Sequence, residues 1–409
     1  GLEFESLRGA VDDESFRRTI DERDVYRYID RRKEILKDND VHVSHHYAFD
    51  DDEVLDPVCR RNAWWSLYSP NCNAFHEVDL PRGFDRDAML ATEDRMLESH
   101  YISHGYYRDV WIVTNEGADG GGGGGGHDGD DAMALKMLRY KHKTDYKSFE
   151  TVRKDALVME RMTRSPRIID IYGHCGSSVA VESLDRELEE FVVPGTGYAD
   201  PSRDLNDSRD LDVKNNFTVT EKLEIALAMA ESISDLHGFE DGIVVHDDIQ
   251  LCQWLWTKDG RLKLGDFNRA EVMLWDEKKQ EYCKHNNGKG YGNYRAPEEF
   301  DADDLNEKID VWSMGNNIYG LLTGLWIFYE NEDDEVVQKM IVDGETAYVD
   351  DRYRTRSYAE GRLVEIMERC WKKDPDDRAT IFEVAEFLRE TLNEHNRRLA
   401  GGGGGALVG

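Results

Sequence analysis

The sequence predicts an α+β fold with two lobes, a small β-rich lobe followed by a larger α-helical lobe. Apolar and polar residues alternate in Tyr106–Thr114 and again in Ala132–Leu138, with the period of a β-strand. Thr220–His237 has strong helical periodicity instead, with Thr220 as its expected N-cap. Beyond residue 300 the apolar segments are mostly helical as well. Strands therefore come first and helices later, which separates the two lobes along the chain.

The remaining segments predict how the lobes are bounded. Lys147–Met162 has helical period and follows the second strand. Two polar insertions, 117–131 with its run of glycines and 185–216, bury too little apolar surface to be ordered, so we expect both to be flexible. The expected regions are a polar N-terminal extension over 1–98 with an aromatic segment at 56–84 that packs on the neighbouring domain, an N-lobe over 99–190, a C-lobe over 191–396 and a flexible tail over 397–409.

Composition narrows the class of partner. The chain has 409 residues, of which 39% are hydrophobic, enough for a large two-lobed core. Its formal net charge of −33 argues against nucleic acid and against anionic lipid, because phosphates would be repelled. The same charge favours a basic partner at long range. No apolar run of about 18 residues is present, so no membrane span is expected within the given chain.

The cysteines leave the compartment open between the cytoplasm and the lumen of the secretory pathway. None of the six has the C-x-x-C spacing of a zinc site. Cys59 and Cys72 lie close enough in sequence for a local disulfide if the protein is luminal. Asn206 and Asn216 begin glycosylation sequons. The alternative is two reduced thiols and two unmodified asparagines.

Three separated residues have the chemistry of phosphoryl transfer, which needs a cation on the phosphates, a carboxylate for metal ions and a carboxylate for the nucleophile. Lys136 lies in a strand, Asp248 follows the helix that ends at His237, and Asp266 follows a short strand, Arg261–Leu264. Three further motifs come later: Ala296-Pro297-Glu298, Asp310-Val311-Trp312-Ser313-Met314-Gly315 and Cys370-Trp371-x-x-Asp374-Pro375-x-x-Arg378.

In this order and context the motifs resemble those of the eukaryotic protein kinase superfamily over roughly residues 100–390. The resemblance implies a bilobal protein kinase-like fold, ATP and Mg2+ as cofactors, and a protein substrate. It implies that Lys136 contacts the α- and β-phosphates, that Asp248 orients the substrate hydroxyl, and that Asp266 binds magnesium.

The resemblance also implies supporting roles. Asp155, standing where the pattern has Glu, is the expected ion-pair partner of Lys136, with Glu160 as the competing candidate. Gly105 and Val110 match the glycine-rich loop that covers the nucleotide. Architectural roles fall to a Glu298–Arg378 ion pair and to Asp310, which holds the catalytic loop.

Several positions depart from the family pattern. Gly105 is the one glycine kept in a loop that should read G-x-G-x-x-G-x-V, and Arg108 offers a direct phosphate contact instead. Gln250 replaces the catalytic-loop lysine, a lost positive charge that should slow transfer. Gln253 replaces an asparagine, and its amide oxygen can still ligate magnesium. Tyr291 replaces the threonine that usually bonds the catalytic aspartate and lysine.

The activation segment lacks the usual means of control by phosphorylation. Asp247 replaces the arginine that grips its phosphate, and no Ser or Thr lies between Asp266 and Glu298. We therefore expect no activating phosphorylation there, and a pairing of Asp247 with Lys284 or Lys289 instead.

The sequence thus predicts a protein kinase that transfers the γ-phosphoryl group of ATP to a protein hydroxyl. Two alternatives remain: a pseudokinase that acts as a nucleotide-binding scaffold, and a kinase-fold enzyme that phosphorylates a small molecule or a glycan. The preference for Ser/Thr or Tyr stays open, because Gln250 and Tyr291 occupy the positions that usually signal it.

Overall fold

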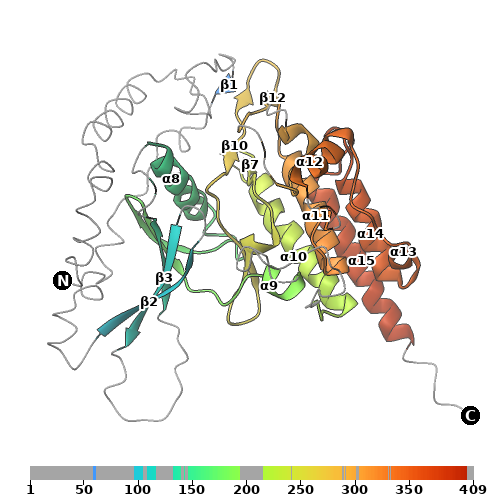
Figure 1. Ribbon diagram of the computed structural model, residues 1–409, viewed down its shortest axis with the longest axis horizontal. Helices are drawn as coiled ribbons and strands as arrows, with labels where there is room; N and C mark the ends of the chain where they lie inside the picture. Colours follow the sequence, from blue (N-terminus) through green and yellow to red (C-terminus); the bar gives the residue numbers. More distant parts are fainter. Residues whose placement is uncertain are drawn as a thin grey trace, which may run out of the picture.

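The computed structural model confirms the two-lobed α+β architecture, with a β-rich lobe beside a larger helical one (Figure 1). It describes the following residues: 59–60, 96–104, 108–116, 132–139, 142, 146–193, 215–240, 242–287, 290, 292–300, 304–329, 331 and 333–402.

The N-lobe is a five-stranded antiparallel sheet in the order β2-β3-β4-β6-β5. Its strands are β2 (Met96–His104), β3 (Arg108–Glu116), β4 (Met133–Leu138), β5 (Ile171–Cys175) and β6 (Ser178–Glu182). The predicted strands correspond to β3 and β4, and the sheet begins at Met96, just before the expected start of the lobe at residue 99.

One helix, α8 (Tyr146–Arg161), packs against β5 and β6 of this sheet. Its bounds agree with the predicted helix to within one residue at each end. Every residue from Val152 to Met159 is buried, so the middle of α8 is enclosed on all sides.

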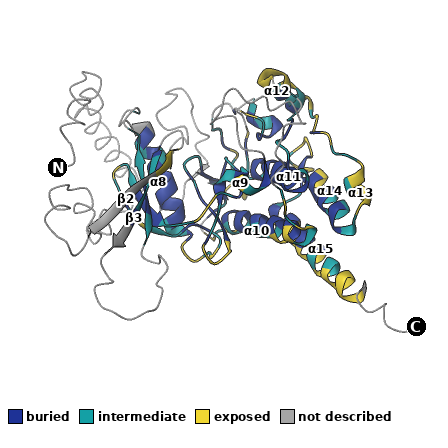
Figure 2. Cartoon of the chain, turned by 60° about the horizontal axis from the view of Figure 1, so that its bottom comes forward, coloured by how far each residue is buried: buried dark blue, intermediate teal, exposed yellow. Residues whose placement is uncertain are grey.

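The C-lobe is built around α10, α11, α14 and α15, whose facing sides are buried (Figure 2). Its helices are α9 (Glu189–Val192), α10 (Val219–His237), α11 (Lys308–Thr323), α12 (Asp334–Asp343), α13 (Arg352–Thr355), α14 (Tyr358–Cys370) and α15 (Ile381–Gly402). One hydrophobic core contains residues of α8 together with these helices, so the two lobes share packed side chains.

Short paired strands between the lobes position the candidate site. β7 (Val244–Val245) pairs with β10 (Glu271–Val272), and β8 (Trp254–Trp256) pairs with β9 (Leu262–Leu264). A third small sheet has the order β1-β11-β12, formed by β1 (Cys59–Arg60), β11 (Trp275–Asp276) and β12 (Glu281–Tyr282). Two 3-10 turns, η1 (Leu251–Gln253) and η2 (Pro297–Phe300), complete the elements.

Three sequence expectations are corrected. The N-cap of α10 is Thr218, not Thr220, because Thr218 and Glu221 form a reciprocal capping box. The insertion expected over 185–216 begins as ordered chain, since Leu188 and Val192 are buried in the core. The tail expected from residue 397 is helical as far as Gly402.

Other expectations lie outside the described residues: the glycine-rich insertion 117–131, residues 194–214, and nearly all of the N-terminal extension. Within the extension, β1 is described, and it pairs with β11. No helix in the described ranges is long and apolar enough to cross a membrane.

Candidate active site

The segment that carries Asp248 leaves β7 and is held by a buried carboxylate of α11. Asp310 accepts hydrogen bonds from the backbone N–H of His246 at 2.8 Å and of Asp247 at 2.9 Å, and its Oδ2 lies 2.9 Å from His237 Nε2. Asp247 has φ 58°, a left-handed conformation that costs energy in a non-glycine residue. The anchoring by Asp310 stabilises this turn, as the sequence predicted.

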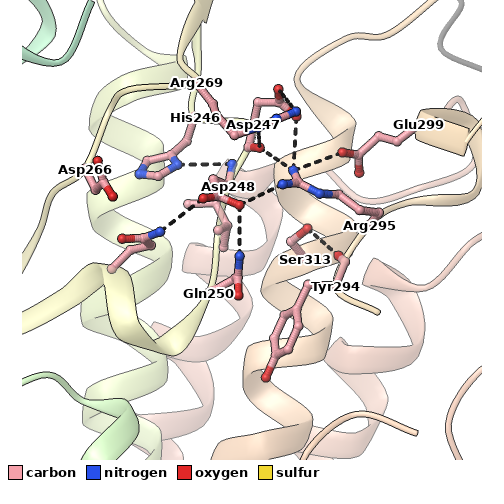
Figure 3. A network of polar contacts seen from close by, with 12 residues as sticks. His246, Asp247, Asp248, Gln250, Asp266, Arg269, Tyr294, Arg295, Glu299 and Ser313 are labelled. Carbon is pink, nitrogen blue, oxygen red and sulfur yellow. Dashed lines mark hydrogen bonds and ion pairs between the residues drawn. The ribbon is translucent and has the colours of Figure 1, made fainter. Parts of the chain in front are cut away.

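Three donors surround the carboxylate of Asp248 (Figure 3). Oδ1 accepts from Gln250 Nε2 at 2.9 Å and from Arg295 Nη2 at 2.8 Å, and Oδ2 accepts from Gln253 Nε2 at 3.2 Å. The side chain of Asp248 keeps 16% exposure, so a substrate hydroxyl can reach it. Both predicted glutamines therefore lie at the predicted catalytic aspartate.

Arg295 is a site residue that sequence reasoning missed. Figure 3 shows its guanidinium between Asp247, Asp248 and Glu299. Burial works against its charge, yet Glu299, Asp247 and Asp248 together raise the pKa of Arg295. A permanent cation thus lies against Asp248, where the lysine replaced by Gln250 would have supplied one. Its place directly before Ala296-Pro297-Glu298 was the available signal.

Asp266 follows β9 after Gly265, which packs closely against Ile169. A Cβ on Gly265 would lie 2.3 Å from Cδ1 of Ile169, so a side chain here would force Ile169 to move. Asp266 then has φ 60°, which turns its carboxylate out of the chain path. The next residue, Phe267, is fully buried, with its ring centroid 5.1 Å from that of His246. Packing on both sides therefore fixes where Asp266 lies.

Asp266 would hold a magnesium ion together with phosphates, in competition with the guanidinium of Arg108. The Asp266 side chain is 34% exposed, and Oδ1 accepts from Arg108 Nη2 and Asn268 Nδ2, each at 2.7 Å. Gln253 lies on the same loop as Asp248 and offers a second oxygen ligand. No group of three or more His, Cys, Asp and Glu gathers anywhere in the described part of the chain, so the ion would need phosphate oxygens to complete its shell.

Asp155 is central, as predicted, but its partner is Arg108 rather than Lys136. It is fully buried on α8, forms an ion pair with Arg108, and accepts from the backbone N–H of Phe267 at 2.7 Å. Burial opposes its ionisation, but Arg108 and Lys136 hold the pKa of Asp155 below its ordinary value. Asp is one methylene shorter than Glu, and the longer arginine reaches it from β3. Lys136 makes no ion pair with any described residue.

The other predicted nucleotide contacts are placed in part. Val110 lies on β3 directly opposite Lys136 of β4 and packs against the core. Gly105 lies outside the described residues, so its predicted contact stays a prediction. Glu160, the competing candidate, does not pair with Lys136 either, because Lys136 makes no ion pair with any described residue. Asp155 holds Arg108 and the Phe267 backbone instead.

The activation segment is bound to the catalytic loop through Asp247. This carboxylate is 1% exposed and accepts from Arg269 Nη2 at 3.0 Å, from Arg295 Nη1 at 3.3 Å and from Asn287. Lys284, a predicted partner, forms no ion pair with described residues, and Lys289 and Tyr291 lie outside them. An ion pair at Asp247 was predicted, and in the structure Arg269 and Arg295 supply its cations instead of Lys284. The alternative pairing with Lys289 stays a prediction.

Two further contacts restrain the same segment. Lys154 of α8 forms a buried ion pair with Glu271 of β10. Cys283, which follows β12, is disulfide-bonded, as is Cys175 at the end of β5. The sequence analysis missed both of these disulfide-bonded cysteines, and the predicted Cys59–Cys72 bond stays a prediction.

The helical lobe contains the expected ion pair between Glu298 and Arg378. Arg378 Nη1 lies 2.7 Å from Glu298 Oε1, and Nη2 lies 3.1 Å from Oε2, a bidentate pair with the arginine fully buried. It joins the end of the activation segment to the turn before α15, in keeping with the architectural role that the resemblance implies.

Comparison with known proteins places this site in a family. Residues 124–388 match the model of the protein kinase domain. The chain is 22% identical over 277 residues to Integrin-linked protein kinase 1 of Arabidopsis thaliana, covering 68% of this chain and 54% of that protein. It is 24% identical over 246 residues to Serine/threonine-protein kinase 12 of the same plant, covering 60% and 49%. It is 27% identical over 179 residues to Dual specificity protein kinase shkE of Dictyostelium discoideum, covering 42% and 23%. The chain spans about half or less of the length of these relatives.

Proposed function

Because the chain belongs to the protein kinase family, we propose that it transfers the γ-phosphoryl group of ATP to a hydroxyl group of a protein. One observation carries the proposal: Asp248 is partly exposed, and Gln250, Gln253 and Arg295 orient its carboxylate. A residue retained only for the fold would not need three donors around an accessible carboxylate.

The chain's own residues divide the work of transfer. Magnesium, when bound, neutralises charge on the phosphates. Lys136 supplies a cation toward the phosphates, and Asp266 with Gln253 would hold the metal. Asp248 accepts the hydrogen bond of the substrate hydroxyl and takes its proton. The hydroxyl oxygen forms a bond to the γ-phosphorus while the bond to the β–γ bridging oxygen breaks, which leaves ADP.

A basic protein segment is the substrate that the site's charge favours. Glu187, Glu189 and Glu190 lie together at the start of α9, and Glu187 forms a β-bridge with Leu255 of β8. Burial, followed by the charges of Glu187 and Glu190, raises the pKa of Glu189 to about 7. Crowded carboxylates gain from a nearby cation, and the net charge of −33 acts in the same direction.

We also propose that activity does not depend on phosphorylation of the activation segment. Asp247 already supplies a buried negative charge to Arg269 and Arg295, so these arginines are occupied without a phosphate. Mapping of phosphosites on protein from its native source tests this. A stoichiometric phosphotyrosine in the segment whose removal abolishes activity would contradict it.

A pseudokinase is the second candidate, and the contact of Arg108 with Asp266 favours it. In that case Arg108 keeps Asp266 from a metal, and the site holds nucleotide without transfer.

Transfer to a small molecule or a glycan is the third candidate function. The disulfide-bonded Cys175 and Cys283 support it, because they favour an oxidising compartment such as the secretory lumen. Asn216 is exposed, as a glycosylated asparagine must be.

One assay set tests the proposed function. The purified chain is incubated with labelled ATP, Mg2+ and a library of basic peptides, beside Asp248→Asn and the exposed control Asp259→Asn. We expect Asp248→Asn to lose roughly 10²–10⁴-fold in transfer while it still binds nucleotide, and the control to keep its rate. Nucleotide-dependent thermal stabilisation without transfer in the unaltered chain supports the pseudokinase instead.

A further inference from the structure

Arg108 has an unusual position, with one guanidinium binding two carboxylates of the site. Nη1 forms an ion pair with Asp155, and Nη2 lies 2.7 Å from Oδ1 of Asp266. The side chain is 6% exposed, so these contacts are shielded from water. A guanidinium is not deprotonated in proteins, so Arg108 stays a cation at every relevant pH.

The sheet register brings Arg108 and Lys136 to the same place. Val110 of β3 is paired with Lys136 of β4, and Arg108 is paired with Leu138. Residues two apart on a strand share a face, so Arg108 and Lys136 project from one face of the sheet. They are diagonal neighbours, a separation of roughly 7–8 Å between backbones that long side chains readily span.

Arg108 and Lys136 both keep N–H groups that can donate hydrogen bonds to a ligand. A guanidinium carries five N–H groups, and the contacts with Asp155 and Asp266 each need one. The side chain of Lys136 makes no hydrogen bond or ion pair with any residue in the described ranges, and its charge acts on Asp155 only through space. Arg108 can therefore keep both carboxylates and still donate to a phosphate oxygen.

We propose that Arg108 is a resident cation of the nucleotide site, which bridges Asp266 to a phosphate as a divalent metal otherwise would. This rests on the proposed nucleotide binding. It has two consequences of opposite direction. Arg108 lets the site bind a nucleoside triphosphate with little help from Mg2+, and it competes with Mg2+ for Asp266.

Calorimetric titration of ATP tests both consequences without any measurement of transfer. The dissociation constant is measured in EDTA and at several Mg2+ concentrations, for the unaltered chain and for Arg108→Gly, which has the glycine of the family pattern. In EDTA we expect Arg108→Gly to bind ATP roughly 10- to 100-fold more weakly, the loss of a charge-assisted hydrogen bond. The Mg2+ concentration that gives half of the full effect on ATP affinity, the half-effective concentration, should fall in Arg108→Gly, because Arg108 no longer occupies Asp266.

Two more variants separate this role from a structural one. Arg139→Ala is the matched control, because Arg139 also extends from this end of the sheet but pairs with Asp109, at 3.2 Å. It should change neither quantity. Arg108→Gly leaves Asp155 without its main partner, so the double variant Arg108→Gly, Asp155→Glu gives Lys136 a longer carboxylate to pair with. We expect it to fold and to bind ATP in Mg2+ but only weakly in EDTA.

The outcomes distinguish the inference from the proposed function. Equal ATP affinity in EDTA for the unaltered chain, Arg108→Gly and the double variant overturns the role of Arg108 and leaves the proposed function standing. A rise in the half-effective Mg2+ concentration in Arg108→Gly also overturns it. Absence of ATP binding by the unaltered chain, with and without Mg2+, overturns the proposed function itself.

Discussion

Replacing Asp247 by Asn keeps the shape of this side chain and removes its charge. Loss of one partner from a buried ion pair costs about 3–5 kcal/mol, because the other charge is left without compensation. Here Arg295 is 11% exposed and Arg269 is 33% exposed, so Arg269 can recover part of its hydration. Glu299 remains beside Arg295, at 3.2 Å. We therefore expect the lower end of the range, about 3 kcal/mol of unfolding free energy.

The charge of Glu299 responds in the same variant. Burial, together with the nearby Asp247, raises the pKa of Glu299 to about 8, although Arg295 acts in the other direction. Removal of the Asp247 charge should lower the pKa of Glu299 and let it ionise beside Arg295. This relief limits the loss of stability and is a further reason to expect about 3 kcal/mol rather than 5.

Urea unfolding followed by tryptophan fluorescence measures the difference. Asp259→Asn is the matched control, since Asp259 is 60% exposed and pairs with Arg261, and it should change stability by less than about 0.5 kcal/mol. Burial opposes ionisation of Asp247, but Arg269 and Arg295 lower its pKa in the folded state. Its contribution is therefore present above the ordinary carboxyl pKa and is lost as the pH falls through the lowered one. A loss below about 1 kcal/mol at neutral pH would refute the reasoning.

Two other predictions concern stability. Burial, followed by the charges of Glu187 and Glu190, raises the pKa of Glu189 to about 7 in the folded state, so its contribution to stability is complete below the ordinary carboxyl pKa and is lost as the pH rises through 7. Glu189→Gln should therefore be more stable than the unaltered chain at pH 8, by up to roughly 3 kcal/mol, and equally stable at pH 4. Equal gains in stability at both pH values would contradict the assignment. Cys283 is disulfide-bonded in the activation segment, so Cys283→Ser should lower the free energy of unfolding by about 2–4 kcal/mol under oxidising conditions, and reductant should then change its stability less. Cys252→Ser alters a free thiol, so its stability should respond to reductant as that of the unaltered chain does.

Features carried by local sequence were predicted well. α8, β3 and β4 follow from periodicity, and the residues of each motif are neighbours in the chain. The Thr218 cap was also predictable, because Thr218-Val219-Thr220-Glu221 has the spacing of a capping box; Thr220 lies two residues later, inside the helix. Residues 185–193 were misjudged because their polarity hides Leu188 and Val192, which anchor the segment.

Contacts between distant parts of the chain could not be predicted. Arg108 is 47 residues from Asp155 and 158 from Asp266, and only the register of β3 on β4 brings it over both. The family pattern pairs the strand lysine, here Lys136, with a glutamate on the helix. Asp is shorter, and the competition between Lys136 and Arg108 is decided by reach and packing, which periodicity does not encode.

Three departures from the family pattern, at positions 108, 247 and 250, can be understood together as a redistribution of charge. At 247 and 250 the catalytic loop exchanges an arginine and a lysine for Asp and Gln, which makes it strongly more negative. Arginines from other elements then contact this region: Arg269 and Arg295 at Asp247 and Asp248, and Arg108 at Asp266. A buried carboxylate without a cation is costly, so each of these arginines stabilises the carboxylate with which it forms an ion pair. Because Arg295 joins Asp247 to Asp248, the charge that fixes the activation segment also orients the catalytic carboxylate. A phosphate on this segment would have to compete with Asp247 for the same arginines, which is the physical reason for the proposal that activity needs no such switch.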